Sequence, residues 1–253
     1  MKKSKNMGRV DCSRGGGKIL IPILLCSNLI FIASTVTVLV RYGYAKRIGI
    51  KLGLVEYDQK SIPDYWAVDG WTNSLEKLNL KVDVAFFGNS ITRMSSFDEY
   101  FKNVSICNLG YAGDNLDGML RRVKMLKAVH PEKIFVMGGI NGLKDISEQD
   151  FRLKYEHLLS DIRDSLPDAE IFVQSMLPVN HTVYHLYGDN QRISSFNEII
   201  KDIASRKSVR YIDLYSLYLQ NGELPSELTM DGIHLYPHSY QLWAQKISPF
   251  LKE

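Results

Sequence analysis

Five short runs rich in β-branched and aromatic residues alternate with longer segments of helical character, and this alternation constrains the fold more than any other feature of the sequence. It begins at about residue 82 and continues to the C-terminus. The runs span residues 82–88, 104–110, 133–139, 169–175 and 208–214. Strands that alternate with helices of this length are typical of βαβ units, so we predict a parallel sheet with helices packed on it.

The segments between and after these runs place their apolar residues at helical spacing. Ser147 and Asp150 form a capping box, which predicts where one of the helices begins. We expect four amphipathic helices, whose apolar faces comprise Leu116, Leu120 and Val123; Phe151, Tyr155, Leu158, Leu159 and Ile162; Ile193, Phe196, Ile199, Ile200 and Ile203; and Leu242, Trp243 and Ile247.

The direction of the strands restricts where chemistry can occur. Connections between parallel strands are right-handed, and ligands of such sheets bind beyond the carboxyl ends of the strands. A functional side chain is therefore expected directly after a strand, whereas a packing residue can lie anywhere.

An uncharged stretch from Ile19 to Val40 precedes the alternating region. Its length is sufficient to cross a hydrocarbon core of roughly 30 Å as a helix. A cleaved signal peptide is the main alternative, but the apolar run is long and no clear small-x-small cleavage site follows it. A core helix of a soluble domain would be shorter and would carry a polar face. We predict an uncleaved signal anchor over residues 19–40.

The distribution of charge orients this predicted anchor. Six Lys and Arg residues precede it and four follow it closely, which by the positive-inside rule favours a cytoplasmic N-terminus and a domain outside the cytoplasm. Residues 61–253 contain 20 basic and 25 acidic residues. Because this part is mildly acidic, we expect no nucleic-acid partner.

Polar residues and glycines occupy the expected positions after the strands. Ser90 follows the first run, Gly110 ends the second, and Asn141 follows the third, whereas Asp231 and His234 lie in a short turn before the last helix. Ester hydrolysis needs a nucleophilic hydroxyl, a base, a carboxylate that orients the base, and donors for the developing oxyanion. These residues include all four kinds of group.

The positions of these residues in the chain predict which contacts each of them makes in the site. Asp231 and His234 are three residues apart, so the carboxylate can accept from the imidazole Nδ1–H while Nε2 faces Ser90. The backbone N–H groups of Ser90 and Gly110 and the side-chain amide of Asn141 are the candidate oxyanion donors.

The motifs around these residues resemble the four sequence blocks of the SGNH hydrolases, also called GDSL-type esterases and lipases. In chain order they are FFGNSIT, NLGYAGDN, GGING and DGIHLYP, and the resemblance covers roughly residues 82–253. It implies a three-layer α/β/α, flavodoxin-like domain with a five-stranded parallel sheet. It also implies a triad of Ser90, His234 and Asp231, with Ser90, Gly110 and Asn141 in the oxyanion hole.

Two positions depart from the usual pattern of that family. Asn89 stands where an Asp commonly precedes the nucleophile, a change that the family tolerates because this residue is not the triad acid. Gly142 stands where an Asp often follows the Asn of the third block, which leaves the implied role of Asn141 intact.

Other polar residues give weaker indications. No pair among the remaining histidines shows metal-site spacing, so neither a metal nor another cofactor is expected. Residues 175–190 should form a loop over the site. In that loop Tyr184, His185 and Tyr187 either shape substrate choice or belong to an ordinary exposed loop.

The predicted protein is a membrane-anchored serine esterase that acts outside the cytoplasm on short acyl esters of small molecules or glycans. The alternatives are a lysophospholipase or thioesterase, and a binding module that keeps the fold without catalysis. The predicted parts are a basic cytoplasmic tail (1–18), a transmembrane anchor (19–40), a connector that packs on the domain (41–80) and the hydrolase domain (81–253).

Overall fold

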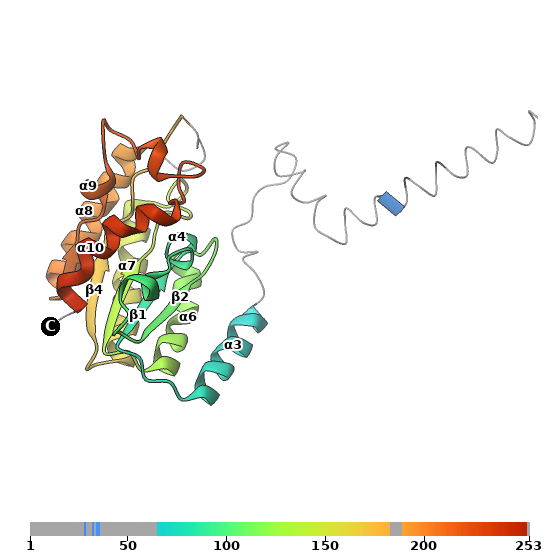
Figure 1. Ribbon diagram of the computed structural model, residues 1–253, viewed down its shortest axis with the longest axis vertical. Helices are drawn as coiled ribbons and strands as arrows, with labels where there is room; N and C mark the ends of the chain where they lie inside the picture. The colour runs from blue at the N-terminus through green and yellow to red at the C-terminus, as the bar shows by residue number, and fades with distance from the viewer. Residues whose placement is uncertain (1–27, 29–31, 33, 36–64, 183–188, 252–253) are drawn as a thin grey trace, which may run out of the picture. The chain divides into compact units, whose positions relative to one another are not determined.

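The computed structural model describes residues 28, 32, 34–35, 65–182 and 189–251 (Figure 1). The described fold belongs to the compact unit formed by residues 60–253. The predicted tail, and all but four residues of the predicted span at 19–40, lie outside the described residues. Among the residues that are described, no helix has both the length and the apolar character to cross a membrane.

The sheet has five parallel strands in the order β2-β1-β3-β4-β5, which confirms the predicted parallel sheet. Each strand lies within one of the predicted runs. The strands are β1 (Val84–Gly88), β2 (Ile106–Gly110), β3 (Lys133–Met137), β4 (Glu170–Gln174) and β5 (Arg210–Ile212).

Helices cover both faces of the sheet and make the domain a three-layer α/β/α structure, as predicted. On one face α6, α7 and α8 pack side by side, and on the other α10 packs against α5. Short helical turns complete the connections. The bounds are α4 (Ser90–Arg93), α5 (Phe97–Tyr100), α6 (Leu116–Val129), α7 (Glu148–Ser165), α8 (Asn190–Arg206), α9 (Tyr215–Tyr218), η2 (Ser226–Leu228), η3 (Pro237–Ser239) and α10 (Tyr240–Leu251).

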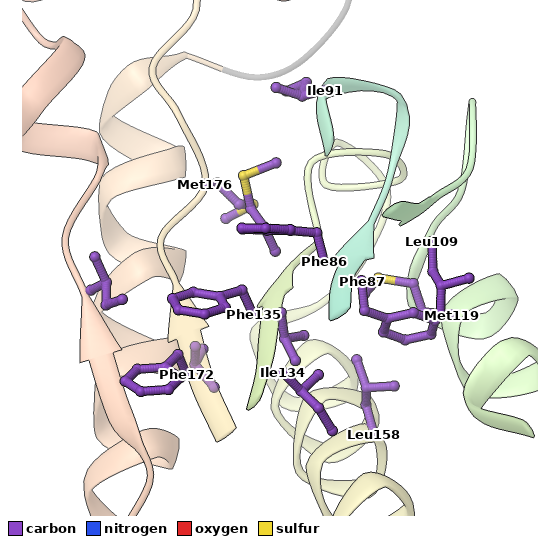
Figure 2. Close-up of a cluster of buried hydrophobic side chains, with 14 of the residues drawn as sticks. Phe86, Phe87, Ile91, Leu109, Met119, Ile134, Phe135, Leu158, Phe172 and Met176 are labelled. Carbon is purple, nitrogen blue, oxygen red and sulfur yellow. The ribbon is translucent and has the colours of Figure 1, made fainter. Parts of the chain in front are cut away.

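The alternation of side chains along the strands divides the core into two layers (Figure 2). Phe86, Phe135 and Phe172 stack in a row across three neighbouring strands, with ring centroids 5.2 and 4.6 Å apart. Phe87, the neighbour of Phe86, packs toward Met119 of α6 on the opposite face. Each fully buried phenylalanine contributes about 1.5–3 kcal/mol to folding, so these rows anchor β1 firmly.

A helix that the sequence did not predict, α3 (Tyr65–Leu78), occupies the described part of the predicted connector. Val68 and Leu75 are buried, and α3 packs against α6. Between them lies Thr72, whose hydroxyl donates to the Val68 carbonyl. Val68, Trp71, Leu75 and Leu78 recur at helical spacing, so the pattern for this helix was present in the sequence although the helix was not predicted.

Candidate active site

Ser90 lies where β1 turns into α4, at the carboxyl end of the sheet (Figure 1). Asn89 caps α4, because its Oδ1 accepts the Ile91 N–H at 2.9 Å, and its side chain is buried. A Cβ atom at Gly88 would collide with the Thr92 side chain and the Met137 carbonyl, so only glycine fits there. The turn therefore holds Ser90 at a fixed place beside the end of β3.

Asp231 and His234 lie in a tight turn that is closed by backbone hydrogen bonds. The Met230 N–H donates to the His234 carbonyl at 3.0 Å. Asp231 Oδ1 accepts from the N–H groups of Ile233 and His234 at 3.1 and 2.8 Å. These bonds join residues within four positions of one another, so the turn itself places the carboxylate beside the histidine.

The structure brings Ser90, His234 and Asp231 together. His234 Nε2 lies 2.9 Å from Ser90 Oγ, and His234 Nδ1 lies 2.6 Å from Asp231 Oδ2. The side chains of His234 and Asp231 are 24% and 42% exposed, so substrate and water can reach the imidazole.

The Asp231 carboxyl keeps its charge in this setting. Partial burial raises its pKa, but hydrogen bonds from the His234 side chain and from the backbone of His234 and Ile233 lower it more. The net shift is below the ordinary value for an aspartate, and the carboxylate can hold the imidazole in the tautomer that carries its proton on Nδ1.

One contact holds the histidine turn, and another holds the serine turn, against neighbouring elements. The Asn180 N–H, in the loop after β4, donates to the Gly232 carbonyl at 2.8 Å. The Tyr240 hydroxyl, at the start of α10, donates to the Ile91 carbonyl in α4 at 2.6 Å. Because Asn180 belongs to the predicted loop 175–190, the first part of that loop contacts the site. The predicted residues Tyr184, His185 and Tyr187 lie outside the described residues.

Asn141 lies in the turn after β3 and is largely buried. Its Nδ2 donates to the Asp114 carbonyl at 2.8 Å, which places the amide beside the loop that follows β2. An amide nitrogen carries two hydrogens, so one donor of Asn141 remains for a substrate oxygen.

The backbone N–H groups near Ser90 differ in whether they are already engaged. The Gly110 N–H donates to Asn108 Oδ1 at 2.9 Å. By contrast, the N–H groups of Ser90 and Gly113 donate to no other residue in the part of the chain that the structure describes. Gly113 is exposed and has a φ of 75°, which favours glycine. The sequence analysis named Gly110 as the oxyanion donor of the loop after β2 and did not consider Gly113. The signal for Gly113 was its place in that loop, immediately before Asp114.

A buried ion pair that sequence reasoning missed lies behind the site. Arg122 of α6 donates to Asp114 Oδ2 at 2.8 Å, to the Leu109 carbonyl at 2.8 Å and to the Gly88 carbonyl at 3.0 Å. The side chains of Arg122 and Asp114 are only 2% and 1% exposed. One guanidinium thus ties together the ends of β1 and β2 and the loop after β2. The signal was an arginine one helical turn from both Met119 and Leu126, at the spacing of a buried helix face.

The remaining histidines and acids form no metal centre in the described ranges, because no group of three or more His, Cys, Asp or Glu side chains lies close enough to hold an ion. His181 Nε2 accepts the Asn190 N–H at 3.2 Å, and His238 Nε2 lies 3.2 Å from the Glu227 carbonyl. The first contact joins a loop to the start of α8, and the second joins η3 to η2. The arrangement that can perform chemistry is the hydroxyl, imidazole and carboxylate of Ser90, His234 and Asp231, which is suited to nucleophilic attack.

Comparison with protein families gives one match in this region. The model of the GDSL-like lipase/acylhydrolase family matches residues 86–242, which include all the candidate residues described above. Comparison with curated protein sequences gives no match.

Solved structures share the fold at low sequence identity. A protein from Streptococcus pneumonia is 23% identical, with 72% of this chain and 92% of that chain covered at a TM-score of 0.65. A GDSL-like lipase from Bacteroides thetaiotaomicron is 17% identical, with 73% and 97% covered at a TM-score of 0.63. The acetyl xylan esterase AlAXEase is 18% identical, with 66% and 98% covered at a TM-score of 0.57. At these identities the likeness concerns the fold alone.

Proposed function

The chain belongs to the GDSL-like lipase/acylhydrolase family, and from that membership we propose that Ser90, His234 and Asp231 are the catalytic triad with which it cleaves its substrate. The protein is an ester-hydrolysing serine hydrolase. The observation that carries the assignment is the pair of distances at His234, 2.9 Å to Ser90 Oγ and 2.6 Å to Asp231 Oδ2.

The proposed reaction depends on which imidazole nitrogen of His234 carries the proton. Asp231 accepts from Nδ1–H, so Nε2 has a lone pair that takes the proton of Ser90 Oγ as the oxygen attacks the ester carbonyl. The protonated imidazole then gives this proton to the departing alcohol, which leaves an acyl-enzyme on Ser90. A water, deprotonated by the same nitrogen, attacks the acyl group and releases the acid.

Three donors are proposed for the oxyanion that forms during attack. They are the Ser90 N–H, the second amide hydrogen of Asn141, and one backbone N–H of the loop after β2. For the third donor we favour Gly113 over Gly110, because the Gly110 N–H already donates to Asn108. A crystal structure of the phosphonylated enzyme tests this choice, since a true donor should lie about 2.7–3.1 Å from the phosphonyl oxygen.

A fluorophosphonate probe tests the nucleophile directly. The full-length parent should be labelled, Ser90→Ala should not, and Ser96→Ala should label like the parent. Ser96 is a matched control, since it is close in sequence and exposed, and its side chain makes no capping hydrogen bond. A folded parent that the probe does not label would instead support the catalytically silent binding module.

Short acyl groups, in particular acetyl groups on carbohydrate, are the proposed substrates. One of the solved structures with a similar fold is that of an acetyl xylan esterase, which supports this choice by analogy. A lysophospholipase or thioesterase is the alternative. An activity panel that compares acetyl with octanoyl esters, and acetylated sugars with lysophospholipid, decides between them. A strong preference for octanoyl esters or lysophospholipid would contradict the proposal.

The proposed location rests on the sequence of the N-terminal region alone. Residues 19–40 are uncharged and long enough to span a bilayer, and they follow a basic tail. We accordingly assign residues 1–18 to the cytoplasm, 19–40 to a membrane anchor, 41–80 to a connector and 81–253 to an exported hydrolase domain. A reporter active only outside the cytoplasm should work when fused after Glu253, and the full-length protein should stay in membranes through an alkaline wash. Release of an N-terminally shortened species would show cleavage instead.

A further inference from the structure

A cavity of about 460 Å³ lies between α3, α6 and the end of β2. This volume is within the range of about 300–1,000 Å³ that is typical of small-molecule sites. Apolar side chains from three elements line much of it, and polar groups lie among them. The lining includes Val68, Trp71, Leu109, Met125, Arg93 and Tyr111.

The cavity adjoins the candidate active site through two elements. Arg93 is the last residue of α4 and Ser90 is the first, so they are one helical turn apart and their side chains lie on the same side of that turn. Tyr111 begins the loop that also contains Gly113, and its N–H donates to the Gly88 carbonyl at 3.0 Å. A ligand in the cavity can therefore be continuous with an ester group held at Ser90.

Trp71 gives the cavity an aromatic surface. Its neighbour on the same face of α3, Val68, is buried, whereas the Trp71 side chain is 64% exposed at the cavity. Figure 1 shows α3 lying alongside α6. A pyranose ring presents C–H bonds on one face, and these pack well on the electron-rich face of an indole. A flat, accessible indole beside a polar rim is therefore suited to a sugar ring.

Arg93 gives the cavity a positive charge. Its guanidinium is exposed, and it forms no ion pair within the described part of the chain. Among the described residues no carboxylate lines the cavity, and the other arginine there, Arg122, is already paired with Asp114. A guanidinium binds a carboxylate through two parallel hydrogen bonds, so Arg93 is available to pair with a carboxylate on a ligand.

We propose that this cavity is a sugar subsite that takes a uronate, a pyranose unit bearing a carboxylate, when the O-acetyl ester of that sugar lies at Ser90. The uronate ring stacks on Trp71 and its carboxylate pairs with Arg93. The assignment rests on the proposed esterase function and specifies its substrate class.

The stacking contact is tested with full-length protein, using the monoacetylated methyl glucuronide and 4-nitrophenyl acetate. Trp71→Ala should lower the ratio of kcat/KM on the sugar ester to kcat/KM on 4-nitrophenyl acetate about tenfold, because only the sugar ester reaches the indole. Leu78→Ala is the matched control, since Leu78 lies on the same helix, is also 64% exposed and does not line the cavity. It should leave the ratio unchanged. An unchanged ratio in Trp71→Ala would overturn the proposal.

The charge contact is tested with two sugars that differ only in the carboxylate, the monoacetylated methyl glucuronide and the monoacetylated methyl glucoside. The parent should prefer the glucuronide about tenfold or more, and Arg93→Gln should abolish that preference, because a charged hydrogen-bond pair is lost for one sugar only. Equal rates on the two sugars in the parent would refute the uronate assignment. A Trp71→Ala defect confined to octanoyl esters would show that the cavity holds an acyl chain instead.

Failure of the subsite and failure of the esterase function give different results. A parent that is neither labelled by fluorophosphonate nor active on any ester contradicts the function. The subsite is then tested by binding of methyl glucuronide to the full-length Ser90→Ala protein, measured by calorimetry. Binding that is lost in the Ser90→Ala/Trp71→Ala double variant supports the subsite, and absence of binding overturns it.

Discussion

The Asp231–His234 pair and the Asp114–Arg122 pair both join a carboxylate to a nitrogen base a few residues along the chain, but they lie in opposite environments. The first pair is 42% and 24% exposed, and it keeps one imidazole nitrogen for Ser90. The second is at most 2% exposed, and its guanidinium also donates to two backbone carbonyls. The exposed pair can exchange protons with a substrate, whereas the buried pair holds fixed positions.

The two pairs have different roles: one takes part in the reaction, and the other holds the surrounding structure in place. Burial raises the pKa of Asp114, and the attraction of Arg122 only partly opposes this shift. For Asp231 the hydrogen bonds prevail and the pKa is lowered. A carboxylate that orients a catalytic base must stay charged at the working pH, whereas a buried charged group that holds the structure must be fully partnered. The following experiments test this division, starting with the largest expected effect.

Asp231→Asn should lower kcat on 4-nitrophenyl acetate by about 10³–10⁴, because an amide can no longer hold the imidazole tautomer. The fold should remain intact, since the pair is partly exposed. Asp161→Asn is a matched control, because His157 Nε2 lies 3.2 Å from Asp161 Oδ1 in another His–Asp pair on the exposed surface of α7. That variant should keep full activity. A loss of less than tenfold in Asp231→Asn would mean that another carboxylate, or none, orients His234.

Arg122→Ala should lower the free energy of unfolding by about 3–5 kcal/mol, because it leaves the Asp114 carboxylate buried without a partner. Urea unfolding of the full-length protein measures this loss. The double variant Asp114→Asn/Arg122→Met should recover part of the stability, since no uncompensated charge remains.

Arg152→Ala serves as the surface control, because Arg152 pairs with Asp202 where both side chains are well exposed. Its unfolding midpoint should match that of the parent. Equal midpoint shifts in Arg122→Ala and Arg152→Ala would remove the distinction between bracing and surface pairs.

Asn141→Ala should lower kcat by about 10²–10³ with little change in KM, because its amide is expected to donate to the oxyanion and not to the bound ester. Asn89→Ala should instead lower stability by about 0.5–2 kcal/mol through loss of the α4 cap. Steady-state kinetics and thermal unfolding of both variants separate the two roles. The larger kcat loss at Asn89 would remove Asn141 from the oxyanion hole.

The acid limb of the pH profile should show the smallest effect, about a tenfold fall in kcat/KM per pH unit. Activity requires a neutral imidazole, and imidazoles gain a proton in mildly acidic solution. Because the pKa of Asp231 is below the ordinary aspartate value, its carboxylate stays charged across this limb and adds no second protonation. A slope of two in the logarithmic profile would indicate that a carboxylate titrates together with the histidine.

The strands and most of the long helices could be predicted from short-range sequence patterns, such as capping residues and the spacing of apolar side chains. Ser147 caps α7 as its capping box predicts, with the Asp150 N–H donating to its hydroxyl at 3.0 Å. The helix α3 was not predicted, although Val68, Trp71, Leu75 and Leu78 recur at helical spacing in its sequence. The role of Arg122 was missed because its hydrogen-bond acceptors belong to other elements. A charged residue on a buried helix face cannot be paired with its acceptors until the positions of those elements are known.

The sequence by itself determined the parallel sheet, the strand ends that carry Ser90 and Asn141, and the close approach of Asp231 to His234. All of these depend on spacings of a few residues, which bond geometry and short-range hydrogen bonds convert directly into structure. The pairing of His234 with Ser90 was predicted, but only the tertiary structure brings Nε2 to 2.9 Å from Ser90 Oγ across 144 positions of the chain. It also decided that the Gly110 N–H donates to Asn108, whereas the Gly113 N–H donates to no residue in the described ranges, and that α3 lines a cavity beside α4. Contacts of this kind depend on how whole elements pack, and no local pattern in the chain records the outcome of that packing.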